Sequence, residues 1–189
     1  MPVTPASVSG LVAANLSSTG NLGIAAPLIA AGVGNGVGTW NPQIVVMTVD
    51  AGSAGAGSGG PIPVPLPGSL VGLMTAAFAA FGIKGMAGPT IATGIANGLI
   101  QAYLQGLIKT THAGVGLGSG VATFRAPPAG PSMVGGFKSA GLLGTFAEPM
   151  ALAVGSALDS AFASLVVPIP IVGSASPTGA SGTGVGQII

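Results

Sequence analysis

The chain contains no cysteine among its 189 residues. Disulfide bonds, zinc–thiolate sites and thiol catalysis are therefore excluded. Charged residues are also scarce, at 4 % of the chain, whereas ordinary soluble domains carry about 25 %. The four basic side chains are too few to form the electrostatic footprint of a nucleic-acid-binding protein, so we expect no specific nucleic-acid partner. A surface so poor in charge protects a free monomer little against association, and we expect other chains to cover most of it.

Histidine is limited to one residue, His112, with no cysteine and no nearby acid to complete a metal site or a nucleophilic triad. Its counterpart in the internal repeat described below is Asp50, so the shared plan does not require an imidazole. Glu148 precedes Pro149 at a predicted helix start, where a negative charge suits the helix dipole. Asp159 is expected to face solvent or a partner's basic side chain. We therefore predict no catalytic residue, no metal site and no cofactor, and we expect that the chain is not an enzyme.

Long apolar runs are missing as well. A transmembrane helix needs roughly 20 mostly apolar residues. Residues 69–82 are too short, and residues 142–167 contain Glu148, Pro149 and Asp159. Each acid near the middle of a span would cost about 3 kcal/mol. A membrane-associated or membrane-inserted, glycine-rich helical protein, located at the membrane, remains the alternative interpretation.

What the chain does contain is an internal repeat. Residues 7–36 align without a gap with residues 69–98, at an offset of 62. The identical positions include glycines, a proline and an Asn-Gly pair, at Gly10/Gly72, Gly20/Gly82, Gly23/Gly85, Pro27/Pro89 and Asn35-Gly36/Asn97-Gly98. A third copy begins at Ser132–Gly135, which resembles Ser69–Gly72, and reaches its own proline at Pro149 with about three residues deleted. We therefore divide the chain into repeats of residues 1–68, 69–131 and 132–189, an organisation that usually serves architecture.

The residue pattern within each repeat predicts two helices followed by an extended arm. In the second repeat, Ser69 is the predicted N-cap of a helix that ends at Gly82. Pro89 then lies in the first turn of the next helix. The buried stripe of that helix recurs every four residues, at Ile91, Ile95, Leu99, Tyr103 and Leu107. We expect a mainly α fold with extended or β arms: three tandem helical hairpins, over residues 7–40, 69–107 and 132–165, each followed by a Gly/Pro-rich arm.

The candidate interaction residues are of two kinds. Gly32 and Gly36, and at matching positions Gly94 and Gly98, lie four residues apart on the second helices. Because a helical glycine costs about 1 kcal/mol relative to alanine, we expect close helix–helix approach to compensate. The run Pro61–Pro67 has proline at every second position, which excludes an interior strand and favours a polyproline-like arm. Its intervening residues are apolar and favour docking on a neighbouring chain; they are Ile62, Val64 and Leu66.

The arms also contain the glycine-rich stretches Thr110–Gly116 and Gly182–Ile188. With these stretches, the chain resembles the small, Gly/Ala-rich, charge-poor structural proteins of tailed-bacteriophage virions. The second stretch is similar to histidine-and-glycine segments of tail-spike and baseplate proteins, although it lacks their paired histidines. The resemblance implies a virion protein assembled in the host cytoplasm and located in a tail, baseplate or neck rather than in the capsid lattice. Its partners would be copies of itself and other structural proteins of that assembly.

Overall fold

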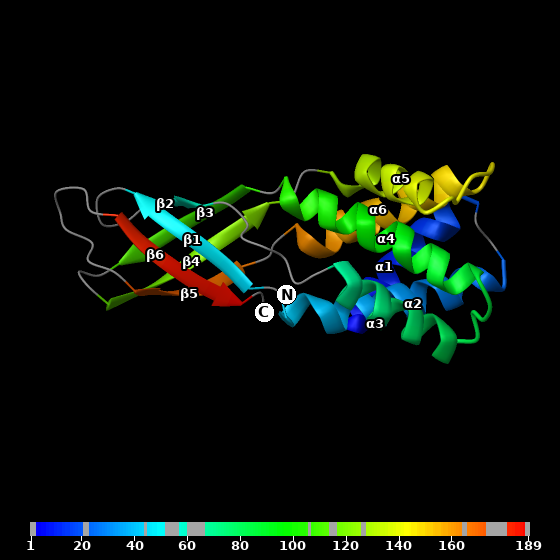
Figure 1. Ribbon diagram of the computed structural model, residues 1–189, viewed down its shortest axis with the longest axis horizontal. Helices are drawn as coiled ribbons and strands as arrows, with labels where there is room; N and C mark the ends of the chain where they lie inside the picture. Colours follow the sequence, from blue (N-terminus) through cyan, green and yellow to red (C-terminus); the bar gives the residue numbers. More distant parts are fainter. Residues whose placement is uncertain are drawn as a thin grey trace.

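The computed structural model describes residues 3–20, 23–43, 45–51, 57–59, 67–105, 107–113, 117–125, 128–163, 166–172 and 181–187. The side chains discussed below lie in residues 3–20, 23–43, 69–105 and 128–163, where all secondary structure is helical. Six α-helices and one short 3₁₀ helix occur in the described residues: α1 (Pro5–Ser18), α2 (Ala25–Trp40), η1 (Asn41–Gln43), α3 (Pro67–Ala80), α4 (Ala87–Leu104), α5 (Ala129–Ser139) and α6 (Ala147–Phe162). Figure 1 shows these helices gathered at one end of an elongated molecule.

The helices form hairpin-like pairs, as the sequence predicts: α1 contacts α2, α3 contacts α4, and α5 contacts α6. Glycines with positive φ end the first helix of each pair, at Gly20, Gly82 and Gly141. In the second hairpin the amide of Ile83 also donates to the carbonyl of Phe78 at 2.8 Å, which closes the helix end in the usual glycine-dependent manner. The predicted role of Gly82 is therefore confirmed.

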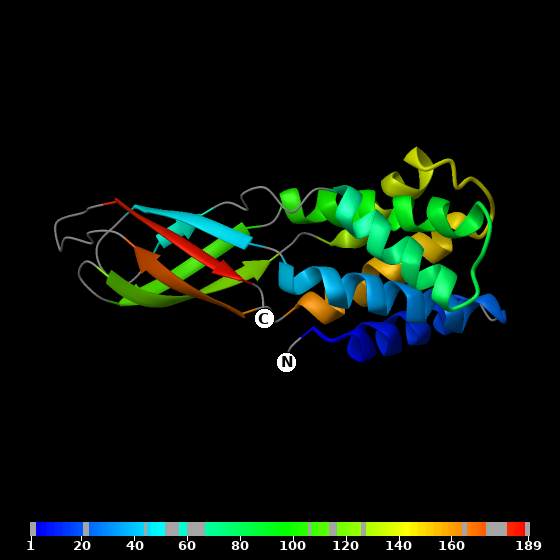
Figure 2. The same cartoon turned by 60° about the horizontal axis from the view of Figure 1, so that its bottom comes forward.

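The three hairpins close into a ring. Besides its own partner, α2 contacts α3, α4 contacts α5, and α6 returns to contact α1; Figure 2 shows α1 lying along α2 at the edge of the bundle. The first helices bury a single stripe, such as Val8, Val12 and Leu16 of α1. The second helices α2 and α4 are buried over a much wider face.

Six strand segments, described by their backbone, form one sheet at the other end of the molecule (Figure 1). They are β1 (Val45–Ala51), β2 (Gly57–Gly59), β3 (Leu107–Ala113), β4 (Leu117–Arg125), β5 (Val166–Val172) and β6 (Ser181–Gln187). In the described part of the chain their order is β1-β6-β5-β4-β3-β2, and all pairs are antiparallel. The strands of the three repeats thus follow one another in the same cyclic order as the helices, and β1 pairs with β6 where the first and last repeats meet.

Strand β5 shows how alternate prolines fit inside a sheet. Pro168 and Pro170 lie in this strand, which is placed between β4 and β6. Prolines two residues apart remove amide donors from one edge of a strand only. Pairing with β4 extends over the whole of β5, whereas pairing with β6 covers only Ile171 and Val172. The sequence analysis excluded an interior strand for the similar run Pro61–Pro67. Residues 61–66 of that run lie outside the described part of the chain, so the prediction is not tested.

Several predicted boundaries are wrong by a few residues. Ser69 is not an N-cap, because α3 already begins at Pro67, a residue suited to the first helical position. Helix α4 ends at Leu104, so the buried stripe ends at Tyr103 and Leu107 begins β3 instead. The third hairpin spans Ala129 to Phe162 rather than residues 132–165.

The third repeat is also out of register with the alignment predicted from sequence. Met74 of α3 contacts Gly36, and Met133 of α5 contacts Gly98, the counterpart of Gly36 at the 62-residue offset. Met133 therefore corresponds to Met74, not to Leu70 as the match of Ser132 with Ser69 implied. The difference is one helical turn. The deletion in the third repeat therefore lies at the start of α5, which has 11 residues, whereas α3 has 14.

Candidate interaction surfaces

The four glycines predicted from sequence lie where successive repeats meet. Gly32 and Gly36 of α2 face Phe78 and Met74 of α3, so closely that a Cβ at either glycine would overlap the facing side chain. At the next junction a Cβ on Gly94 would lie 2.9 Å from the ring of Phe137, and one on Gly98 would lie 2.6 Å from the Cα of Met133. Real Cβ atoms do not approach so closely, and these positions accept no side chain unless α3 or α5 shifts.

At the third junction, between α6 and α1, the first helix carries smaller residues and the second helix carries larger residues than at the other two junctions. The residues of α1 that correspond to Phe78 and Met74 at the 62-residue offset are the smaller Leu16 and Val12. The residues of α6 that correspond to Gly94 and Gly98, at the 59-residue offset that relates Met74 to Met133, are the larger Ala153 and Ala157. All four are buried in one hydrophobic cluster, and α1 contacts α6. A large residue facing glycine is thus replaced by a smaller residue facing alanine, which preserves close packing.

Aromatic residues from all three repeats meet at the end of the bundle nearest the strands. The ring of Tyr103 in α4 lies 5.6 Å from that of Trp40 in α2 and 5.5 Å from that of Phe162 in α6, both in edge-to-face geometry. Tyr103 also donates its hydroxyl to the Oδ1 of Asn41 at 3.1 Å, and burial raises the pKa of Tyr103 well above its ordinary value. The indole N–H of Trp40 and the amide N–H of Asn41 have no acceptor in the part of the chain that the structure describes. This polar and aromatic cluster fastens the three second helices together.

The acidic residues have structural roles in the described part of the chain. The Oδ1 of Asp159 accepts a hydrogen bond of 2.8 Å from the amide of Ala129 and so caps α5 from the neighbouring helix α6. The carboxylate of Asp159 remains partly exposed to solvent, as predicted, but it also serves the helix start of its own hairpin, which the sequence analysis did not predict. Partial burial raises the pKa of Asp159, and the hydrogen bond from Ala129 opposes that rise. Glu148 lies in the first turn of α6, as predicted.

The remaining predicted residues lie in the strands or outside the described part of the chain. His112 lies in β3 with its backbone opposite Gly120, and its counterpart Asp50 lies in β1 opposite Gly182. Within the described residues, no group of three or more His, Cys, Asp or Glu side chains is placed to hold a metal ion. The apolar arm residues lie outside the described part of the chain; they are Ile62, Val64 and Leu66.

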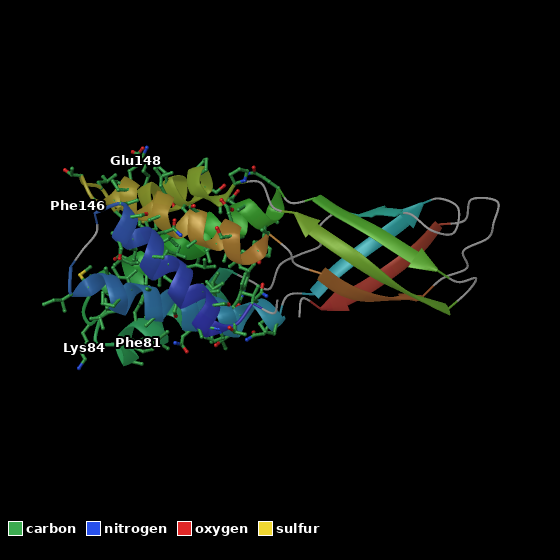
Figure 3. The ribbon with its side chains drawn as sticks, turned by 180° about the vertical axis from the view of Figure 1, so that it is seen from behind. Phe81, Lys84, Phe146 and Glu148 are labelled. Carbon is green, nitrogen blue, oxygen red and sulfur yellow. The ribbon has the colours of Figure 1, made fainter. Side chains whose placement is uncertain are left out.

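A set of exposed apolar residues was missed by the sequence analysis. Ile24, Met86 and Phe146 directly precede α2, α4 and α6, at the N-cap position, and they are 90 %, 87 % and 73 % exposed. We call these three residues the tip triad, because the hairpin turns that contain them lie at the end of the bundle farthest from the strands (Figures 1 and 3). Ile24 and Met86 are 62 residues apart, so the repeat offset was the signal that would have revealed them.

The tip triad contributes little to the stability of the fold. None of the three side chains makes a capping hydrogen bond. All three residues have helical backbone torsions, so a polar side chain at these positions would not gain the usual N-cap hydrogen bond. Since these side chains are also largely exposed, their apolar surface contributes little to the core. The three turns therefore share exposed apolar groups that the core does not require.

An apolar cavity of about 350 Å³ lies beside this end of the bundle, between the α1–α2 turn and the start of α6. Its lining contains no charged side chain; the residues are Leu16, Gly20, Gly23, Ala25, Ala26, Ile29, Phe146 and Met150. Leu16 occupies the position that the larger Phe78 fills in the second repeat. The cavity therefore lies at the junction where α1 carries the smaller residue.

Comparisons with protein-family models, with curated protein sequences and with solved structures find no match to this chain. None of the helices in the described ranges combines the length and the apolarity needed to cross a bilayer.

Proposed function

We propose that this chain is a structural subunit of a large protein assembly, a tail, baseplate or neck component of a phage virion, which acts by packing against copies of itself and other structural proteins. The observation that carries the proposal is the closed ring of three repeats, in which each described helix contacts both of its ring neighbours. Such a ring presents related surfaces three times around one axis. It therefore fits an axial position in an assembly with threefold symmetry.

The distribution of charge and apolar surface supports the same proposal. Seven large apolar side chains are exposed in the described residues: Ile24, Phe81, Met86, Leu104, Leu143, Phe146 and Leu152. The whole chain has only seven charged residues to oppose association through them. The carboxylate of Asp159 lies at the start of α5 and Glu148 at the start of α6, so the proposal assigns no catalytic role to them.

Mass spectrometry of purified virus particles tests the proposal directly. We expect the chain in the particles at a fixed ratio to the other structural proteins, and particles without it would contradict the virion assignment. A second test compares His112→Ala with Gly98→Leu in particle assembly. The histidine change is expected to leave assembly largely intact, whereas a leucine at position 98 would force α4 away from Met133 of α5. The opposite pattern would refute the structural role.

Sedimentation of the purified chain tests the packing component separately. We expect it to associate with itself and to bury an interface larger than the roughly 1,600 Å² of a standard protein–protein complex. A stable, soluble monomer at micromolar concentration would contradict self-association. Binding to another structural protein would then be tested by the mass spectrometry of purified particles.

A further inference from the structure

Three hairpins can be arranged around one axis in two cyclic orders. Each junction of the ring joins the second helix of one hairpin to the first helix of another: α2 meets α3, α4 meets α5, and α6 meets α1. The opposite order would join α2 to α5, α6 to α3, and α4 to α1. Residues 41–66 and 105–128, which connect the hairpins, are long enough to reach either neighbour. Which order forms therefore depends on which helix surfaces fit each other.

The register of α6 within the ring follows from its own close contacts. A Cβ on Gly34 of α2 would lie 2.8 Å from the amide nitrogen of Ser9 in α1. A Cβ on Gly155 of α6 would lie 2.6 Å from the amide nitrogen of Gly130 in α5. Both members of the second contact are 121 residues beyond those of the first, which is the sum of the offsets of 62 and 59. At that register the paired glycines of α2 and α4 are replaced in α6 by two alanines, Ala153 and Ala157.

These two alanines exclude α3 from the surface of α6. At the junction of α2 with α3, a Cβ on Gly32 would overlap the ring of Phe78. A Cβ on Gly36 would likewise overlap the side chain of Met74. Because α6 has a Cβ at both positions, it would meet the same obstruction if it packed against α3 in this geometry. Its actual neighbour α1 carries smaller residues there, Leu16 and Val12.

A second restriction acts at the junction of α4 with α5. A Cβ on Gly136 of α5 would overlap the carbonyl oxygen of Gly94 and would lie 2.6 Å from the amide nitrogen of Gly98. The obstructing atoms belong to the backbone of α4, so they do not move aside as the end of a side chain does. The corresponding residues of the other first helices are larger, Ala77 in α3 and Asn15 in α1. At this distance α4 therefore accepts only α5.

We propose that side-chain size at these junctions fixes the cyclic order of the three hairpins. In the opposite order α6 would meet α3 with two obstructing methyl groups, and α4 would meet α1 with Asn15 at the position that has room only for glycine. Only the junction of α2 with α5 would fit. Every copy of the chain thus closes in one order and presents the same surface. The inference does not depend on the virion assignment, since it concerns contacts within one chain.

Disulfide trapping measures the cyclic order, because the chain contains no cysteine of its own. The amide of Asn97 in α4 lies 3.4 Å from the hydroxyl of Ser139 in α5. The equivalent exposed pair at the junction of α6 with α1 is Ser156 and Ser18. Ser18→Cys/Ser156→Cys therefore reports the observed order. Ala80→Cys/Ser156→Cys, at the equivalent position of α3, reports the opposite order.

Each cysteine variant is oxidised at high dilution, and the monomer is digested with trypsin and analysed by mass spectrometry. Lys84 and Lys138 lie between the two cysteines in both variants, so a cross-link joins two separate peptides. The pair that reports the observed order is expected to cross-link about 100-fold more than the other, because each overpacked position destabilises the opposite order. Comparable cross-linking of the two pairs would overturn the proposal.

Removing the size differences is expected to permit both orders. The variant Val12→Met/Asn15→Gly/Leu16→Phe/Ala153→Gly/Ala157→Gly gives α1 the residues of α5, and α6 those of α4. In this background the two cysteine pairs are expected to cross-link to within about 10-fold of each other. If the pair for the opposite order still fails to cross-link in the folded variant, features other than junction size fix the order and the proposal is wrong.

A rescue experiment decides the matter even if that variant folds poorly. Gly32→Ala/Gly36→Ala is expected to lower the melting temperature by about 10 °C, because both methyl groups obstruct α3. Adding Phe78→Leu/Met74→Val gives this junction the residues that α6 and α1 carry, and is expected to restore most of the loss. A melting temperature that stays low, or one that the two alanines never lowered, would show that size does not determine which helices pack together.

Discussion

The hydroxyl of Tyr103 donates a hydrogen bond of 3.1 Å to the Oδ1 of Asn41, and the two residues are separated by 62 positions. That separation is the repeat offset, so the bond joins equivalent positions at the ends of α2 and α4. The same repeat position thus carries a hydrogen-bond acceptor in the first repeat, Asn41, and a donor in the second, Tyr103. Because both groups are buried, the bond holds these helix ends at a fixed distance, and its loss leaves a buried acceptor without its donor.

Tyr103→Phe is expected to destabilise the fold by about 1–3 kcal/mol, because it leaves the Asn41 Oδ1 buried without the hydroxyl donor. The double variant Tyr103→Phe/Asn41→Leu is expected to be more stable than the sum of the two single changes predicts. Urea denaturation of the wild type, both single variants and the double variant gives the coupling energy. Strictly additive effects would show that the bond contributes nothing.

Gly98→Ala is expected to lower stability by about 1–3 kcal/mol, since the new Cβ would lie 2.6 Å from the backbone of Met133. Gly72→Ala is the matched control: it lies inside α3 with no atom within 4 Å of the added Cβ. There the better helix propensity of alanine is expected to stabilise by up to about 1 kcal/mol. Thermal unfolding of the two variants should shift in opposite directions, and equal shifts would rule out the close-approach explanation.

Asp159 is expected to make stability depend on pH. Burial raises the pKa of this carboxyl in the folded state, so the folded chain binds the proton more tightly than the unfolded chain. Its contribution to stability is therefore greatest below the unfolded carboxyl pKa of about 3.9 and declines as pH rises through the folded pKa. Asp159→Asn keeps an oxygen to accept from Ala129 and is expected to reduce this decline.

The measurement for Asp159 is the melting temperature of each variant at pH 4 and pH 7. The difference between Asp159→Asn and wild type should favour the variant more at pH 7 than at pH 4. Asp159→Ala, which removes the acceptor for the Ala129 amide, is expected to cost about 1 kcal/mol at pH 4 and less at pH 7. A melting temperature difference that favours Asp159→Asn more at pH 4 would contradict the direction of the pKa shift.

Ile24→Ser is expected to change the stability of the isolated chain by less than about 0.5 kcal/mol, because the isoleucine is 90 % exposed and its helical backbone torsions give a serine oxygen no capping hydrogen bond. Val33→Ser, in the buried part of the same helix, serves as the opposite control and is expected to destabilise strongly. Chemical denaturation compares the two variants. A loss of stability in Ile24→Ser would show that the exposed isoleucine supports the fold itself.

Local features of the fold were predictable because their causes lie within a few residues. Gly82 ends a helix through its positive φ, Pro89 fits a first turn, and Ile91, Ile95 and Leu99 recur on one buried face. The repeat offset of 62 residues also predicts the bounds of α3 from those of α1, since both helices begin and end at positions that differ by this offset. The register of the third repeat was misjudged because the short match at Ser132 was preferred to an alignment at an offset of 59, which the contact of Met133 with Gly98 supports. That alignment pairs Met74, Phe78, Gly82 and Gly85 with Met133, Phe137, Gly141 and Gly144.

The sequence by itself determined the three helical hairpins, since glycine, proline and apolar spacing act on the backbone locally. Only the tertiary structure decided how the hairpins join. Ring closure depends on the fit of α6 against α1, where Ala153 and Ala157 take the place of glycine, and on the meeting of Asn41, Tyr103 and Phe162 at one end of the bundle. Those relationships connect residues far apart in the chain, so they follow from packing and not from local pattern. The same distinction applies to the tip triad. The sequence places an apolar residue before each second helix, but only the assembled bundle brings the three hairpin turns to one end of the molecule.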